Sequence, residues 1–89
     1  MKTIWKYQFP ENSDVGEFEM PAASYPLCVN IQGTTFCLWA QVETDNPKVK
    51  RKFRIVGTGH RIPESCHISK YVGTIFTEFF VFHIIEEGL

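Results

Sequence analysis

The stretch PLCVNIQGTTFCLWAQVE, residues 26–43, decides the fold class because apolar and polar side chains alternate on both sides of a glycine. Before Gly33, the side chains of Leu27, Val29 and Ile31 share one face of an extended chain. After it, one face of the partner strand carries Phe36, Leu38, Ala40 and Val42. Glycine readily adopts the positive φ of tight hairpin turns. The stretch therefore predicts a β-hairpin with one buried face.

The same period of two recurs outward from this hairpin, whereas helical periodicity is nearly absent. Near the N-terminus, for example, Trp5, Tyr7 and Phe9 lie on one face of an extended chain. Clusters rich in proline and small polar residues separate the alternating segments, as expected of turns. Those segments are TIWKYQF (3–9), VGEFEM (15–20), KVKRKFRIV (48–56), SKYVGTIFT (69–77) and EFFVFHIIEE (78–87).

Length and composition favour a single folded domain over residues 1–89. The chain is 44% hydrophobic and 15% aromatic, which is typical of a globular protein. One sheet alone would leave an apolar face in water, so a second layer is needed. We therefore expect an all-β fold: a small antiparallel β-sandwich or open barrel of about seven strands. Any helix is at most a short turn near residues 62–67.

Two strands depart from simple alternation. Arg51 falls on the apolar side of the strand at 48–56, and we expect it near a strand end. The last strand is apolar on both faces, which predicts either a central strand or an interface. Pairing of this C-terminal strand with a symmetry mate would make a homodimer. Several aromatic side chains also leave two interpretations open, an exposed partner surface or a full core: Trp5, Trp39, Phe76, Phe80 and Phe82.

A local basic stripe runs along one face of the strand at 48–54, in a chain whose net charge is -1. Such a stripe contacts nucleic acid or an acidic protein, or is simply a solvated face that discourages aggregation. Trp39 would support nucleic-acid binding if its strand neighboured this one, since bases stack on aromatic rings. The stripe consists of Lys48, Lys50, Lys52 and Arg54, with Arg51 and Arg61 nearby.

The segment RIVGTGHRIPESCH, residues 54–67, concentrates residue types found in phosphate, metal and nucleophile sites. No long helix follows its glycines, so the pattern favours a turn over a phosphate loop. His60, Cys66 and His67 lack the paired spacing of a zinc site. Cys66 with His60 and Glu64 supplies the residue types for nucleophilic catalysis without showing their geometry. For His60 the alternative is a ring that caps the turn, and for His83 a core or interface position.

The cysteines and the lack of a recognised targeting segment predict a cytoplasmic location. The three cysteines form an odd set, which favours reduced thiols in a cytoplasm over a disulfide scaffold. We recognise no signal peptide and no apolar run approaching the ~20 residues of a membrane helix. We expect no membrane partner and no cofactor or metal.

Six segments occur in a characteristic order along the chain: MKTIWKY, EMP, CLWAQV, KRKFRIVGTGHRIP, YVGTIF and VFHIIE. Together these motifs resemble a family of small uncharacterised bacteriophage proteins. The resemblance implies a phage-encoded protein acting in the bacterial host cytoplasm, and it implies no activity. The segment before KYVGTIF is longer here than in that pattern, so Cys66 and His67 are poor candidates for a shared site.

The combined expectation is a non-enzymatic binding protein of unknown target, whose candidate partners are a host protein and a second copy of the chain. Nucleic-acid binding through the basic strand 48–54 is the alternative, and a hydrolase or metal protein using His60 with Cys66 or His67 is a third. The expected binding residues are Lys50, Lys52, Arg54, Thr58, Gly59, His60 and Arg61.

Overall fold

The computed structural model describes residues 1–88, which form seven β-strands and, over that range, no helix. This confirms the all-β fold and the expected number of strands. Where a short helical turn was expected, the amide of Cys66 donates to the carbonyl of Pro63 at 2.9 Å and closes a reverse turn. The strands are β1 (Lys2–Gln8), β2 (Val15–Pro21), β3 (Tyr25–Gln32), β4 (Thr35–Glu43), β5 (Lys48–Gly57), β6 (Cys66–Phe76) and β7 (Val81–Glu87).

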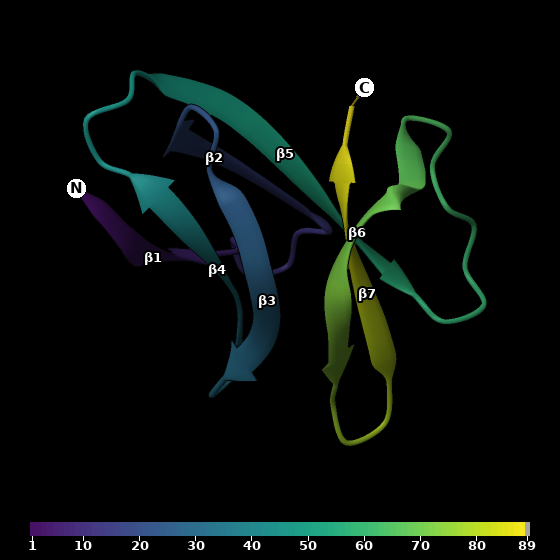
Figure 1. The fold of residues 1–89 in the computed structure, drawn as a ribbon. Coiled ribbons are helices and arrows are strands. Elements are labelled where there is room, and N and C mark those ends of the chain that lie inside the picture. The colour runs from purple at the N-terminus through teal and green to yellow at the C-terminus, as the bar shows by residue number, and fades with distance from the viewer. Residues whose placement is uncertain (89) are drawn as a thin grey trace.

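The strands form two antiparallel sheets, a three-stranded sheet of order β1-β4-β3 and a four-stranded sheet of order β2-β5-β7-β6 (Figure 1). The sheets pack face to face as a β-sandwich, and β3 of one lies against β6 of the other. The hairpin at residues 26–43 forms β3 and β4, and its turn residue Gly33 has a φ of 62°. A positive φ at this position is the conformation for which glycine was expected.

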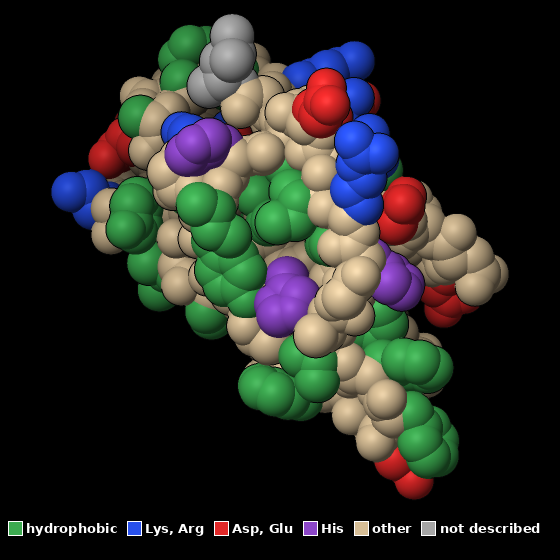
Figure 2. Space-filling model, turned by 90° about the vertical axis from the view of Figure 1, so that its right-hand side faces the viewer, with side chains coloured by type: hydrophobic (Ala, Val, Ile, Leu, Met, Phe, Trp, Pro, Cys, Tyr) green, Lys and Arg blue, Asp and Glu red, His purple; other side chains and the backbone are tan. Residues whose placement is uncertain are grey.

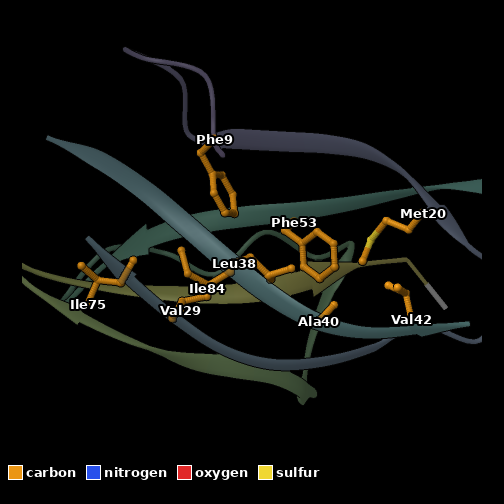
Figure 3. Packing of buried hydrophobic residues seen from close by; sticks show 9 residues of the cluster. All are labelled: Phe9, Met20, Val29, Leu38, Ala40, Val42, Phe53, Ile75 and Ile84. Atoms are coloured by element: carbon orange, nitrogen blue, oxygen red, sulfur yellow. The ribbon is translucent and has the colours of Figure 1, made fainter. Parts of the chain in front are cut away.

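The core lies between the sheets and contains the side chains that alternation placed inward (Figure 3). Aromatic rings on the β2 side pack in tilted and edge-on pairs, such as Phe18 with Phe9 and with Phe53. Such burial in both sheets explains why each strand alternates. The buried cluster is Phe9, Met20, Val29, Leu38, Ala40, Val42, Phe53, Ile75 and Ile84.

Leu27 departs from the expected pattern. Its side chain is 43% exposed, although its place in the sequence put it on the same face as Val29. The register between β3 and β4 shifts between Pro26 and Cys28. Because an extra residue in one strand disrupts the alternation of faces, the bulge releases Leu27 from the core.

Arg51 lies within β5, not near its end, which corrects the expectation from the sequence. Its guanidinium contacts both carboxylate oxygens of Glu86, with Nε to Oε2 and Nη2 to Oε1 each at 2.7 Å. Nη1 also donates to the carbonyl of Ser24 at 2.5 Å. A charged side chain is tolerated on the inner side because its charge is paired and its donors are satisfied.

β7 is central in its sheet, which confirms one of the two interpretations of its apolar faces. It pairs with β5 on one side and with β6 on the other. Because both hydrogen-bonding edges are occupied within the chain, β7 cannot pair with a symmetry mate. The fold therefore leaves no free edge of β7 for strand pairing between two copies of the chain, and the homodimer itself stays a prediction.

Candidate functional site

Exposed apolar side chains gather on the outer side of β6 and β7, and we call Ile62, Ile68, Tyr71 and Phe76 the apolar face. Their exposed fractions are 42%, 60%, 37% and 72%. Figure 2 shows hydrophobic side chains gathered around a histidine on this side of the molecule. Apolar groups gathered on one exposed face mark binding surfaces more often than scattered ones do.

An irregular stretch of β6 builds this face. The pairing with β7 jumps from Cys66 opposite Glu87 to Tyr71 opposite Ile85, so four residues of β6 bulge opposite one of β7. The bulge carries Ile68, and the pairing resumes at Tyr71 on the outer side. Beneath them, Cys66 and Ile85 pack with Val56 in a second, smaller buried cluster.

His83 lies at the centre of a hydrogen-bonded network on the same side. Its Nε2 is 2.7 Å from Thr58 Oγ1, and its Nδ1 is 2.7 Å from the Tyr71 hydroxyl. Thr58 Oγ1 also donates to the Val81 carbonyl at 3.3 Å, and the Tyr71 hydroxyl bonds Thr74 Oγ1. Each ring nitrogen of His83 therefore lies within hydrogen-bond distance of a hydroxyl group.

The turn after β5 lies beside this network. The amide of His60 donates to the carbonyl of Gly57 at 3.0 Å, and Gly59 has a φ of 87°, which favours glycine. The His60 ring packs on Gly57, where an added Cβ would lie 2.9 Å from Nδ1. The turn is thus closed by the His60 backbone, not by its ring, which corrects the capping role considered from the sequence.

A small pocket of about 260 Å³ separates this turn from the sheet. Of the predicted loop residues, Thr58, Gly59 and His60 line it, whereas Arg61 does not. Arg61 instead forms an exposed ion pair with Glu64 at 3.8 Å. The remaining walls are largely aliphatic and come from Val56, Ile62, Ile68 and Ile85, together with Gly57 and His83.

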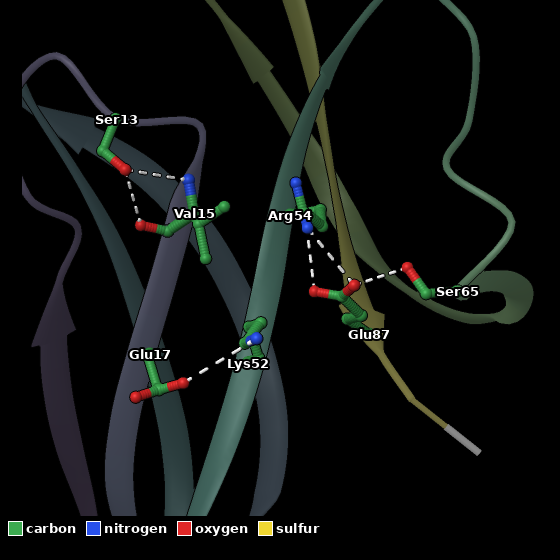
Figure 4. Close-up of polar contacts among 7 residues, drawn as sticks. All are labelled: Ser13, Val15, Glu17, Lys52, Arg54, Ser65 and Glu87. Atoms are coloured by element: carbon green, nitrogen blue, oxygen red, sulfur yellow. Dashed lines mark hydrogen bonds and ion pairs between the residues drawn. The ribbon is translucent and has the colours of Figure 1, made fainter.

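The predicted basic residues of β5 occupy the other half of the same sheet. Figure 4 shows an acidic side chain beside two of them, Glu17 beside Lys52 and Glu87 beside Arg54. Lys50 is opposite Glu19 and Lys52 is opposite Glu17 in the pairing of β5 with β2. Lys52 Nζ lies 3.9 Å from a Glu17 carboxylate oxygen. The stripe is therefore part of a surface of alternating charge.

Arg54 forms an ion pair with Glu87 through two hydrogen bonds, from Nε to Oε1 at 2.9 Å and from Nη2 to Oε2 at 3.3 Å. The Arg54 guanidinium and the Ser65 hydroxyl, which also bonds this carboxylate, hold the pKa of Glu87 below its usual value. Trp39 cannot extend the stripe, because β4 lies in the other sheet. The aromatic support that nucleic-acid binding required from Trp39 is absent from this face.

The candidate metal and nucleophile residues are dispersed. Burial raises the pKa of the Cys66 thiol, which disfavours the reactive thiolate. His67 is exposed, with Nδ1 2.8 Å from Ser69 Oγ. Within residues 1–88, no group of three or more His, Cys, Asp or Glu side chains is arranged to hold a metal ion. All three cysteines are free thiols.

Thiol alkylation should distinguish the three cysteines. Cys28 is exposed, whereas Cys37 and Cys66 are buried. We expect iodoacetamide to modify Cys28 on the order of 100-fold faster than the other two in the native protein, because burial limits access and thiolate formation. Tandem mass spectrometry of the tryptic peptides measures the three rates, because fragmentation separates Cys28 from Cys37 in their shared peptide 7–48. In denaturant the three rates should converge. Rapid native labelling of Cys66 would contradict the burial of its side chain.

Sequence reasoning missed the aromatic and hydroxyl partners of His83. Tyr71 and Thr74 lie on β6 and Thr58 follows β5, so strand order alone brings them to His83 on β7. The visible signal was a histidine within an apolar strand, which indicated a core or interface position without identifying its neighbours.

These features define a small two-sheet β-protein with an apolar outer face, in which no group of three or more His, Cys, Asp or Glu side chains among residues 1–88 is arranged to hold a metal ion. The chain belongs to a family described as a domain of unknown function, DUF7352, whose model matches residues 1–88. This confirms membership of an uncharacterised family. No match was found among curated proteins or among solved structures. Over the described range, no helix is long and apolar enough to cross a membrane.

Proposed function

We propose that this protein is a non-enzymatic interaction module that binds a partner protein through the apolar face and the adjoining β6–β7 hairpin. The observation that carries the proposal is the exposure of three phenylalanines within five residues of that hairpin. Phe76, Phe79 and Phe80 are 72%, 81% and 66% exposed. Aromatic side chains supply most of the binding energy in many protein interfaces.

The hairpin tip is preorganised, which supports the same function. The amide of Thr77 donates to the Phe80 carbonyl at 2.8 Å, and the amide of Phe80 donates to Thr77 Oγ1 at 3.0 Å. Rings on an ordered turn lose little conformational entropy on binding. The hydroxyl groups bonded to His83 also favour binding. If another protein covers the face, both ring nitrogens keep their hydrogen bonds, so no unsatisfied polar group is buried.

The motifs that resemble small phage proteins support a phage-encoded protein that acts in the cytoplasm of its bacterial host, on a host protein. Nucleic acid is a weaker candidate for the partner, because Glu17, Glu19 and Glu87 lie among the Lys and Arg side chains of the basic stripe. A protein that neutralises phosphates needs uncompensated positive charge. A hydrolase is weaker still, since Cys66 is buried and its thiol pKa is raised.

The test compares capture of host proteins by the wild type with capture by Ile68→Ser/Phe76→Ser. The matched control is Ile4→Ser/Tyr25→Ser, which removes exposed apolar side chains from the other sheet, where Ile4 is 57% and Tyr25 67% exposed. We expect the specific host protein to be retained by the control and lost by the first variant. Purified, that protein should bind the first variant at least about 30-fold more weakly, the effect of losing a hot spot.

Equal affinity of both variants for the purified protein would reject the apolar face as the binding surface. Light scattering over a range of concentrations tests a second copy of the chain as the partner instead. Retention on heparin that disappears as salt rises, together with binding of DNA or RNA, would support the nucleic-acid alternative.

A further inference from the structure

A second and larger cavity, of about 610 Å³, lies at the opposite side of the β5 turn from the apolar face. The loop between β1 and β2 forms one wall, and the β3–β4 turn forms another. The end of β5 and the start of β7 complete it, so the cavity opens at one end of the sandwich between its sheets. Its size falls within the range of about 300–1,000 Å³ that is usual for small-molecule sites.

Aromatic rings line the inner part of this cavity. Phe9, Phe36 and Phe82 contribute from three different strands or their ends. The rings of Phe36 and Phe82 pack at a centroid distance of 5.3 Å, tilted by 60°. Aromatic walls accept apolar groups, and their faces also attract cations.

Two carboxylates, Glu11 and Asp14, lie in the loop that forms the cavity rim. Within residues 1–88, neither side chain forms an ion pair or a hydrogen bond. Arg54 attracts Asp14 electrostatically without forming an ion pair with it, and its guanidinium is already bound to both oxygens of Glu87. His60 on the facing wall is the other titratable group that lines the cavity. The rim therefore carries uncompensated negative charge above an aromatic floor.

We propose that this cavity binds a small organic cation, a protonated amine carried on an aromatic or aliphatic body. The carboxylates attract the ammonium group and accept its hydrogen bonds, and the phenylalanines cover its apolar body. An anionic ligand is repelled by the rim, and a neutral ligand gains only the apolar contact. The carboxylates and phenylalanines of this cavity are not part of the apolar face, but Gly57 and His60 of the β5 turn border both the cavity and the smaller pocket beside that face.

The test is a nuclear magnetic resonance titration at pH 7.5 with 2-phenylethylamine, compared with 2-phenylethanol and 3-phenylpropionate. We expect saturable shifts of the amide signals of Thr34, Phe36 and Phe82 with the amine. The alcohol should bind at least about tenfold more weakly, because it lacks the charge, and the acid should not bind. A blocked Phe-Lys dipeptide carries the same chemistry on a peptide. If it binds more tightly than the free amine, the cation is a lysine side chain of a partner, and the reverse order indicates a free amine.

Glu11→Gln/Asp14→Asn should weaken amine binding at least about tenfold and leave alcohol binding unchanged. The control Glu19→Gln/Glu78→Gln makes the same change in net charge away from the cavity, and it should bind the amine like the wild type. The backbone carbonyl of Asp14, which accepts from the amide of Ile55 at 2.8 Å, is retained in the first variant. Amine and alcohol affinities that are equal, absence of saturable shifts at the cavity, or an equal loss in the control would each overturn the proposal.

Discussion

Phe53→Ala is expected to lower the free energy of unfolding by about 4 kcal/mol, the largest effect of any single change that we predict. Phe53 is fully buried at the centre of the core and packs against the ring of Phe18. The truncation removes apolar contact on both sides and leaves a cavity that the two sheets cannot close. For 89 residues, the total stability expected of a globular domain is roughly 4–13 kcal/mol, so this loss removes from about a third to all of it.

Equilibrium unfolding in urea, followed by tryptophan fluorescence, measures this loss for Phe53→Ala. The matched control is Phe79→Ala, which deletes the same ring at a position that is 81% exposed. We expect the control to change stability by no more than about 0.5 kcal/mol. Similar losses for both variants would show that Phe53 does not occupy the centre of the core.

Glu86→Ala is expected to lower the free energy of unfolding by about 2–3 kcal/mol. The side chains of Arg51 and Glu86 are only 19% and 16% exposed. Without Glu86, the guanidinium remains between the sheets with one hydrogen bond, to the Ser24 carbonyl. An unpaired charge in a largely buried position costs more than the ion pair itself contributes, and the partial exposure moderates the loss.

The double variant Arg51→Met/Glu86→Leu separates these contributions, because it removes both charges and retains apolar volume. It should recover most of the stability lost in Glu86→Ala, since apolar pairs often replace buried ion pairs at little cost. Glu17→Ala breaks the exposed pair with Lys52 and should cost less than about 1 kcal/mol in the same urea assay. A double variant as unstable as Glu86→Ala would contradict an origin in the unpaired charge.

The local pattern of the chain predicted the strands and most of their inner faces well. Phe18, Leu38 and Phe53 were assigned to inner faces from alternation alone, and each packs in or against the core. Leu27 was not predictable, because a single bulge shifts its face without changing the composition of the strand. Arg51 looked like an exception at a strand end because its partner Glu86 is 35 residues away in the chain.

In the candidate site too, local pattern predicted which residues share a face but not which residues lie beside them. Alternation placed Lys50, Lys52 and Arg54 on one face, and they do lie on one side of β5. Whether that face is basic depends on the neighbouring strands, and β2 brings Glu17 and Glu19 beside it.

The sequence by itself determined that this protein is built of β-strands, where the chain turns, and which side of most strands faces inward. These properties follow from the period of two and from turn residues, which act over a few positions. Only the tertiary structure decided the order of the strands, and with it the pairing of Arg51 with Glu86 and the partners of His83. Those contacts join residues far apart in the chain, and no local pattern specifies which strands become neighbours in a sheet.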